Sequence, residues 1–363
     1  MKSLMKRSLI LRVFLITTVL LTGCSNGGNS DGPAQSGDAT IIADVLNAPQ
    51  NQGTIRTIGN ATRVEFQGQV RELVDGTVYD VVGTQRTPVD EFYDANFVRE
   101  NYRQSGGVVY RIVPGYGEAV VHRSLADSFE DAEDIHDLIK PPPTSWTSMT
   151  IQSPASPTVA DYVRLRSRIL NRQVDFADNR IDVVTNRQVD GSKSLRFYAT
   201  EPSRRMSITK TSIDNELFYL KNGDQVEFSG WFFLESGRLI SLVDFESDYM
   251  VEAPGIRLMF DGGMRPFVEL KFAMKPVFTM NLGRDFVFPT GEWVKVDLHL
   301  LLADSENGRV ELWMNDEKLI DQTGRTMILH DAIYNSLQVG ITASPRNTET
   351  VLYADSISVK TTP

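Results

Sequence analysis

Two stretches decide the fold: Val226-Glu-Phe-Ser-Gly-Trp-Phe-Phe-Leu234 and Trp293-Val-Lys-Val-Asp-Leu-His-Leu300. In much of both, apolar and polar residues alternate, which is the period of a β-strand that buries one face. Turn dipeptides that favour hairpins separate such stretches, at Asn222-Gly223, Asp261-Gly262 and Asn307-Gly308. From about Leu125 onward the sequence therefore predicts a succession of strands forming an all-β sandwich or barrel.

The composition excludes several classes of protein. The chain has 363 residues, of which 41% are hydrophobic and 23% charged, so it can bury a sizeable core and is neither collagenous nor wholly disordered. Its net charge is −10, which argues against nucleic-acid binding, because that binding depends on basic groups at phosphates. A single cysteine rules out a disulfide framework, and with four histidines it makes a structural zinc site unfavourable, so any metal should be bound by oxygen.

The first 23 residues have the pattern of a bacterial leader. Basic Lys2, Lys6 and Arg7 precede an apolar run, and Leu21-Thr-Gly-Cys24 matches the lipobox of lipoprotein signal peptides. This match implies cleavage before Cys24 and acylation of Cys24, the chain's only cysteine, with several acyl chains giving a stable membrane anchor. Removal of the leader changes the net charge to −14. Ser25 after the cysteine favours the outer membrane, by resemblance to enterobacterial sorting.

The remaining chain divides into a tether, an annex and the strand-rich region. Residues 24–40 are rich in Gly, Ser, Asn and Asp and are predicted to be a flexible tether. Residues 41–123 are expected to form a small α+β annex, with short strands and a helix that starts at Thr87-Pro88 and ends before Gly106. Residues 124–363 are the predicted sandwich.

The strand phrases of residues 125–363 resemble the concanavalin-like jelly rolls of heparin-lyase-type polysaccharide lyases. The phrases that carry the resemblance include Gly191-Ser-Lys-Ser-Leu-Arg-Phe, Gly291-Glu-Trp-Val-Lys-Val-Asp-Leu-His, Gly308-Arg-Val-Glu-Leu-Trp-Met-Asn and Leu352-Tyr-Ala-Asp-Ser-Ile-Ser-Val. The resemblance implies a jelly-roll β-sandwich with a glycan in the groove of its concave sheet. It specifies the fold more than the activity, because the same sandwich carries lyases, glycosidases and lectin-like modules.

The residues that the resemblance implies for lyase chemistry are altered. Such a lyase needs a group that neutralises the uronate carboxylate and an acid/base such as His or Tyr. In Leu242-Val-Asp-Phe-Glu-Ser, Glu246 stands where the relatives have histidine, and in Leu337-Gln-Val-Gly-Ile-Thr, Thr342 stands at the tyrosine position. These departures weigh against the standard mechanism.

Strand alternation nevertheless predicts a polar face for a glycan. The substrate-binding candidates are polar residues opposite apolar neighbours and two tryptophans whose indoles suit stacking on a sugar ring: Arg257, Lys271, Lys295, Gln338, Trp231 and Trp313. His299 and Glu246 are the proton-transfer candidates, should the protein be a lyase. Each of these residues fits equally an ordinary solvated or core position of a sandwich. Arg164, Arg166 and Arg168 are spaced as a basic stripe on a strand, which would suit an anionic sugar or lipid phosphate or a salt-bridged surface.

A structural Ca²⁺ site is implied by resemblance to carbohydrate-binding jelly rolls. There a glutamate of the first strand and an aspartate of the last join backbone carbonyls around the cation, and the matching residues are Glu130 and Asp355. Such a site would tie the two ends of the sandwich together away from the ligand.

Three functions remain open from the sequence. The favoured one is a lipid-anchored, non-catalytic envelope protein that binds a polysaccharide, with anionic glycans among the candidates. The second is a divergent polysaccharide lyase that cleaves an acidic glycan by β-elimination, so whether the protein is an enzyme is left open. The third is a protein-binding component of an envelope assembly.

Overall fold

The computed structural model describes residues 54–58, 61–66, 69–74, 77–89, 101–113, 117–139, 145–204, 206–249, 253–271, 277–328 and 332–363. Cys24 and the tether lie outside these residues. No helix in this part of the chain has the length and apolarity that crossing a membrane requires.

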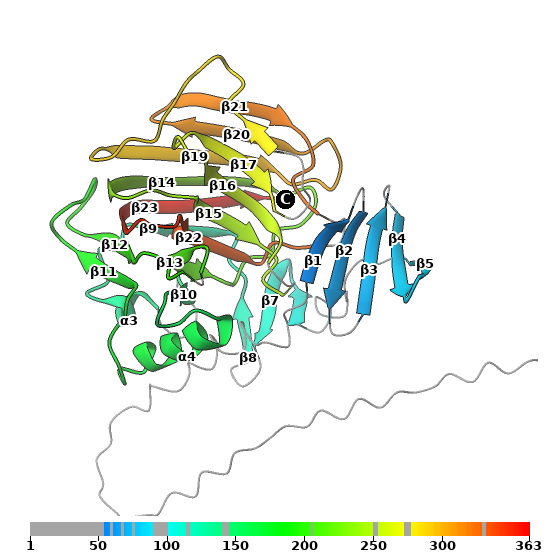
Figure 1. The fold of residues 1–363 in the computed structure, drawn as a ribbon, viewed down its shortest axis with the longest axis horizontal. Coiled ribbons are helices and arrows are strands. Elements are labelled where there is room, and N and C mark those ends of the chain that lie inside the picture. Colours follow the sequence, from blue (N-terminus) through cyan, green and yellow to red (C-terminus); the bar gives the residue numbers. More distant parts are fainter. Residues whose placement is uncertain are drawn as a thin grey trace, which may run out of the picture. The chain divides into compact units, whose positions relative to one another are not determined.

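Two antiparallel sheets form a β-sandwich, as the sequence predicts (Figure 1). The front sheet has the strand order β10 (Ser148–Thr150), β13 (Thr209–Asn215), β22 (Ser336–Ser344), β15 (Ser241–Glu246), β16 (Gly255–Phe260), β17 (Pro266–Leu270) and β18 (Val277–Thr279). The back sheet has the order β11 (Arg180–Val184), β12 (Ser194–Ala199), β23 (Thr350–Thr362), β14 (Gln225–Ser236), β19 (Trp293–Leu301), β20 (Arg309–Met314) and β21 (Glu317–Thr323), with β9 (Ser124–Asp127) also paired to β23. The jelly-roll prediction is confirmed at the level of the fold.

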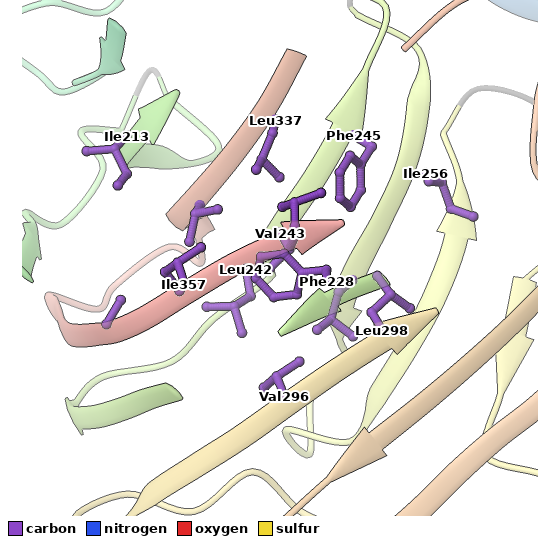
Figure 2. Packing of buried hydrophobic residues seen from close by; sticks show 14 of the residues in the cluster. Ile213, Phe228, Leu242, Val243, Phe245, Ile256, Val296, Leu298, Leu337 and Ile357 are labelled. Atoms are coloured by element: carbon purple, nitrogen blue, oxygen red, sulfur yellow. The ribbon is translucent and has the colours of Figure 1, made fainter. Parts of the chain in front are cut away.

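The core lies between the sheets and explains the alternation in the sequence. In β19, every second residue from Val294 to Leu300 is buried, while the residues between them are half-buried on the outer face. Figure 2 shows the side chains of the two sheets packed against each other. Phe245 of the front sheet meets Phe228 of the back sheet edge to face, with ring centroids 6.4 Å apart. Burial of this apolar surface is the main force that holds the sheets together.

The described part of residues 41–123 consists almost wholly of strands. One sheet is a meander of β1 (Thr54–Ile58), β2 (Ala61–Phe66), β3 (Gln69–Val74), β4 (Thr77–Val82) and β5 (Gln85–Val89), and another is formed by β6 (Tyr102–Ser105), β7 (Val108–Val113) and β8 (Gly117–Val120). The predicted helix start at Thr87-Pro88 is wrong, because both residues pair with β4 in strand β5. Residues 90–100 of that predicted helix lie outside the described residues. Tyr102 and Val109 are buried members of the main core cluster of the sandwich.

The predicted basic strand around Arg164, Arg166 and Arg168 is also wrong. These residues lie in helix α4 (Val159–Leu170), which Thr158 and Asp161 begin with a reciprocal capping box. A second, short helix, α3 (Ile135–Leu138), begins at Asp134. In α4, Arg164 and Arg168 are exposed, whereas Arg166 and Ile169 are buried against the sandwich.

Candidate functional site

A row of five polar residues crosses the outer face of the front sheet at right angles to its strands. Strand register places these residues side by side on β13, β22, β15, β16 and β17, in the order Asp214, Gln338, Asp244, Arg257 and Glu269. We call these five residues the polar row. Their apolar neighbours along each strand point into the core, so the row is the polar half of the strand alternation.

Two ion pairs hold the basic groups of this face. Arg257 pairs with Glu269 across β16 and β17, and both side chains are about three-quarters buried or more. Lys271, just after β17, places its Nζ atom 2.8 Å from Oε1 of Glu246, and their side chains are 11% and 2% exposed. Burial lowers the pKa of Lys271, an effect that the charge of Glu246 opposes. Glu246, which stands where the family resemblance expects histidine, is therefore held in a buried ion pair.

The carboxylates of Asp214 and Asp244 are buried and accept hydrogen bonds from hydroxyl groups. Asp214 accepts from Thr150 Oγ1 and Ser212 Oγ, each at 2.8 Å. Asp244 accepts from Ser241 and from Thr342 Oγ1, the latter at 3.1 Å. Burial raises the pKa of Asp214 to about 6. Burial also raises the pKa of Asp244, and the nearby charge of Glu246 adds to this effect.

Lys210 on β13 is the third basic group of the face. Its charge lowers the pKa of both Asp214 and Asp244, so it lies within electrostatic reach of the two buried carboxylates. The described outer face of the front sheet thus carries four carboxylates and three basic groups. The carboxylates belong to Asp214, Asp244, Glu246 and Glu269, and the basic groups to Lys210, Arg257 and Lys271. The acids outnumber the bases.

Two polar atoms of the row are buried without a hydrogen-bond partner. They are the Oε1 acceptor of Gln338 and the Nε donor of Arg257. Because unsatisfied buried polar atoms cost free energy, such atoms often mark a place where a ligand or water completes the bonding. The Gln338 side chain itself is only half-buried.

Helix α4 and strand β7 contribute charged groups beside this face. Arg166 of α4 is fully buried and donates to Ser148 Oγ at 2.5 Å and to the Met149 carbonyl at 3.1 Å. Burial raises the pKa of Tyr162 to about 12, so this phenol keeps its proton near neutral pH. Arg111 of β7 is buried and donates to the carbonyl of Glu216 at 2.6 Å.

The structure divides the predicted ligand-binding residues between two sheets. Arg257, Lys271 and Gln338 belong to the front sheet, but Trp231, Lys295 and Trp313 lie on the outer face of the back sheet, on β14, β19 and β20. His299 lies beside Trp313, with ring centroids 4.6 Å apart, whereas Glu246 is on the front sheet. The structure therefore does not bring the two proton-transfer candidates together.

Several ion pairs lie on the outer face of the back sheet. Lys295 pairs with Asp297 at 3.1 Å, and Lys318 pairs with Glu311 and Asp321, each at 2.5 Å. The Lys318 ammonium also lies 4.8 Å from the centroid of the Trp313 ring. The flat surface of Trp313 is thus shared with a neighbouring lysine and histidine.

Glu130 and Asp355 both bind the loop before β12. Glu130 accepts from the backbone of Ser192 and Lys193 at 2.9 and 2.8 Å, and Asp355 accepts from the backbone of Val189 and Asp190 at 2.7 and 3.1 Å. The Lys193 ammonium donates to the carbonyls of Glu130 and Ala132. Among the described residues no group of three or more acidic, histidine or cysteine side chains is placed to hold a metal. Ca²⁺ binding at this tie stays a prediction.

Sequence reasoning missed Asp214, Asp244 and Tyr162, and it assigned Arg166 to a basic stripe on a strand. The alternation in Lys210-Thr-Ser-Ile-Asp214 carried a signal for Asp214, because Ile213 is flanked by polar residues on both sides. Asp244 stood in the altered phrase before Glu246 and was passed over. The wrong assignment of α4 to a strand hid Tyr162 and the burial of Arg166.

Comparison with known proteins relates the sandwich to polysaccharide lyases. Residues 272–358 match the family model described as polysaccharide lyase. No curated protein sequence matches the chain. Among solved structures, the chain is similar to an endo-β-1,4-glucuronan lyase from the fungus Trichoderma reesei (15% identity, 51% of this chain and 88% of that one, TM-score 0.41). It is also similar to a cellulose induced protein (12% identity, 65% and 96%, TM-score 0.41) and to the marine alginate lyase of Aplysia kurodai (11% identity, 60% and 99%, TM-score 0.34).

These likenesses concern the fold and assign no role to any residue. The matched segment runs from just before β18 to within β23, so it includes β22 and Gln338 of the polar row. The chain thus carries a polysaccharide-lyase-like segment within a jelly-roll β-sandwich.

Proposed function

We propose that the protein binds a polysaccharide on the outer face of the front sheet, at the polar row, without cleaving it by β-elimination. The match of residues 272–358 to the polysaccharide lyase model supports a glycan as the ligand, since strand β22 in this segment supplies Gln338 of the row.

One observation carries the proposal against elimination. The position at which a catalytic histidine is expected holds Glu246, and its carboxylate is buried in an ion pair with Lys271. β-Elimination needs a base that is free to take the proton and a cation or donor that neutralises the uronate carboxylate. Here Glu246 and Lys271 neutralise each other, so neither is free for its part in elimination.

The other candidate acid/base groups do not replace it. Thr342, at the expected tyrosine position, donates to Asp244, and its hydroxyl has no pKa in the useful range. Tyr162 holds its proton because burial raises its pKa to about 12. None of the outward residues in the seven strands of the described front sheet is a histidine or tyrosine.

The lipid anchor is part of the same proposal. Acylation of Cys24 and the tether up to residue 40 would hold the sandwich at the envelope, in the outer membrane according to Ser25. Metabolic labelling with a radioactive fatty acid tests this step, and label should be absent from Cys24→Ser.

The test of function combines two measurements on the purified full chain in mild detergent. The first is the ultraviolet absorbance of unsaturated uronates, which rises when elimination creates a conjugated double bond. The second is affinity electrophoresis in gels that contain glucuronan, alginate or neutral polysaccharides. We expect flat absorbance and retardation by at least one polymer.

A rise in absorbance that is lost in Glu246→Gln would overturn the proposal and establish a lyase with an altered catalytic set. Flat absorbance without retardation in any gel would favour a protein partner instead. Glu317→Gln, at a partly exposed position of β21 in the back sheet, is the matched control.

A further inference from the structure

We infer that the ligand of the polar row is an uncharged polysaccharide and not a uronate polymer. This inference rests on the proposed function and adds the class of glycan. The observations that carry it are the pairing of the basic groups, the free hydrogen-bonding atoms and the apolar residues beside the row.

The charges of the face disfavour an anionic sugar. Arg257 is paired with Glu269 and Lys271 with Glu246, so neither basic group is available to a uronate carboxylate without breaking a partly or fully buried ion pair. Lys210 lies within electrostatic reach of Asp214 and Asp244. A carboxylate brought to this face would meet four acidic side chains whose neutralising partners are already engaged.

The free atoms of the row suit hydroxyl groups. Gln338 Oε1 is an acceptor without a partner, and it lies in register between Asp214 and Asp244. Arg257 Nε is a donor without a partner, on the other side of Asp244. A sugar hydroxyl both donates and accepts, so one type of group can satisfy both atoms. A carboxylate, which only accepts, cannot satisfy Gln338 Oε1.

Apolar side chains continue the same face at one end of the row. Met259 and Phe267 are opposite each other on β16 and β17, two residues along from the Arg257 and Glu269 pair. Phe267 is half-buried. An aromatic ring next to hydrogen-bonding groups can stack on the C–H face of a pyranose ring. A carboxylate on the sugar makes the pyranose more polar and so less suited to this stacking.

The experiment compares pairs of polymers that differ only at C6. A β-glucan, a galactomannan and a xyloglucan are each used as such and after oxidation of the C6 hydroxyls to carboxylates, in affinity electrophoresis of the full chain. We expect the neutral polymer of at least one pair to bind about tenfold more tightly than its oxidised form. Its retardation should also be insensitive to salt.

Variants locate the binding. Gln338→Ala and Phe267→Ala should each weaken retardation by the neutral polymer by about fivefold to tenfold. Trp231→Ala, on the back sheet, is the matched control and should leave it unchanged. Circular dichroism and melting curves establish that each variant is folded.

A gain of function provides the opposite test. Glu269→Gln removes the partner of Arg257 and frees its guanidinium for a carboxylate. This variant should bind the oxidised polymers more tightly than the wild type does, while its affinity for the neutral polymers changes little.

The failures are distinguishable. Tighter binding of the oxidised polymers by the wild type would overturn the inference and leave the proposed function standing. Loss of binding in Trp231→Ala but not in Gln338→Ala would overturn both the inference and the proposed function, because it would place the ligand on the back sheet. Absence of binding to every polymer, neutral or oxidised, would overturn the proposed function itself.

Discussion

The buried carboxylate of Asp214 makes the stability of the fold depend on pH. It is 2% exposed, and burial raises its pKa to about 6, whereas an aspartate in an unfolded chain titrates near 3.9. The folded state therefore binds the proton more tightly than the unfolded state does. Stability from this group is greatest below about pH 4 and is lost as the pH rises through about 6.

We expect Asp214→Asn to remove this loss. The unfolding free energy of the variant relative to the wild type should increase between pH 4 and pH 7, by up to about 3 kcal/mol. Urea unfolding at several pH values measures the difference, and the exposed Asp175→Asn serves as control. Parallel profiles for wild type and Asp214→Asn would show that Asp214 titrates as it does in the unfolded chain.

The buried pair of Glu246 and Lys271 yields a second residue-scale prediction. Lys271→Met leaves the Glu246 carboxylate buried without its cation and should destabilise the fold by about 3–5 kcal/mol. The double variant Glu246→Gln/Lys271→Met removes both charges and should recover most of that loss. Denaturant unfolding checks both values. Equal destabilisation of the single and double variants would mean that the packing of the lysine stem matters and the pairing does not.

At the scale of elements, alternation predicted the strands and failed at α4. The strands β14, β19 and β20 bury one face, so apolar residues recur at every second position and the sequence shows them directly. In α4 the arginines at 164, 166 and 168 mimic a strand period, although the helix buries only Arg166 and Ile169. The capping pair Thr158 and Asp161 is a helix signal in the sequence, and the prediction from the arginine spacing did not use it.

The matched arginines of α4 provide an element-scale prediction. Arg166→Ala removes donors to Ser148 Oγ and the Met149 carbonyl and leaves a cavity beside β10, so the unfolding free energy should fall by about 2–4 kcal/mol. Arg164→Ala, two residues earlier in the same helix and exposed, should change it by less than about 0.5 kcal/mol. Thermal melting of both variants makes the comparison. Similar effects would show that the helix is held by its apolar contacts alone.

At the scale of the whole molecule, the sequence predicted the sandwich but not the assignment of residues to its two outer faces. Alternation indicates that Lys271 and Lys295 both point outward, and it carries no information about which sheet each strand joins. That assignment depends on pairing between strands far apart in the chain, such as Asp244 with Gln338. For this reason the residues of one predicted site lie on two surfaces. The ion pairs of the polar row could not be predicted without the register of the strands.

The two last strands lie in the middle of the sheets. β22 is bordered by β13 and β15 in the front sheet, and β23 by β12 and β14 in the back sheet. Deletion of residues 350–363 should therefore abolish cooperative unfolding of the sandwich, while deletion of 363 alone should leave it intact. Tryptophan fluorescence during urea titration tests this prediction. A cooperative transition in the long truncation would show that the remaining strands close without β23.

This placement has a consequence for the timing of folding. Until a ribosome has made residues 336–362, at least one of the two sheets lacks its middle strand, and the nascent chain exposes apolar faces of the strands already made. The sandwich cannot be completed segment by segment as the chain emerges. We expect it to close only after β23 has been made, so chaperones or a translocation channel would have to keep the incomplete strands from aggregating until then.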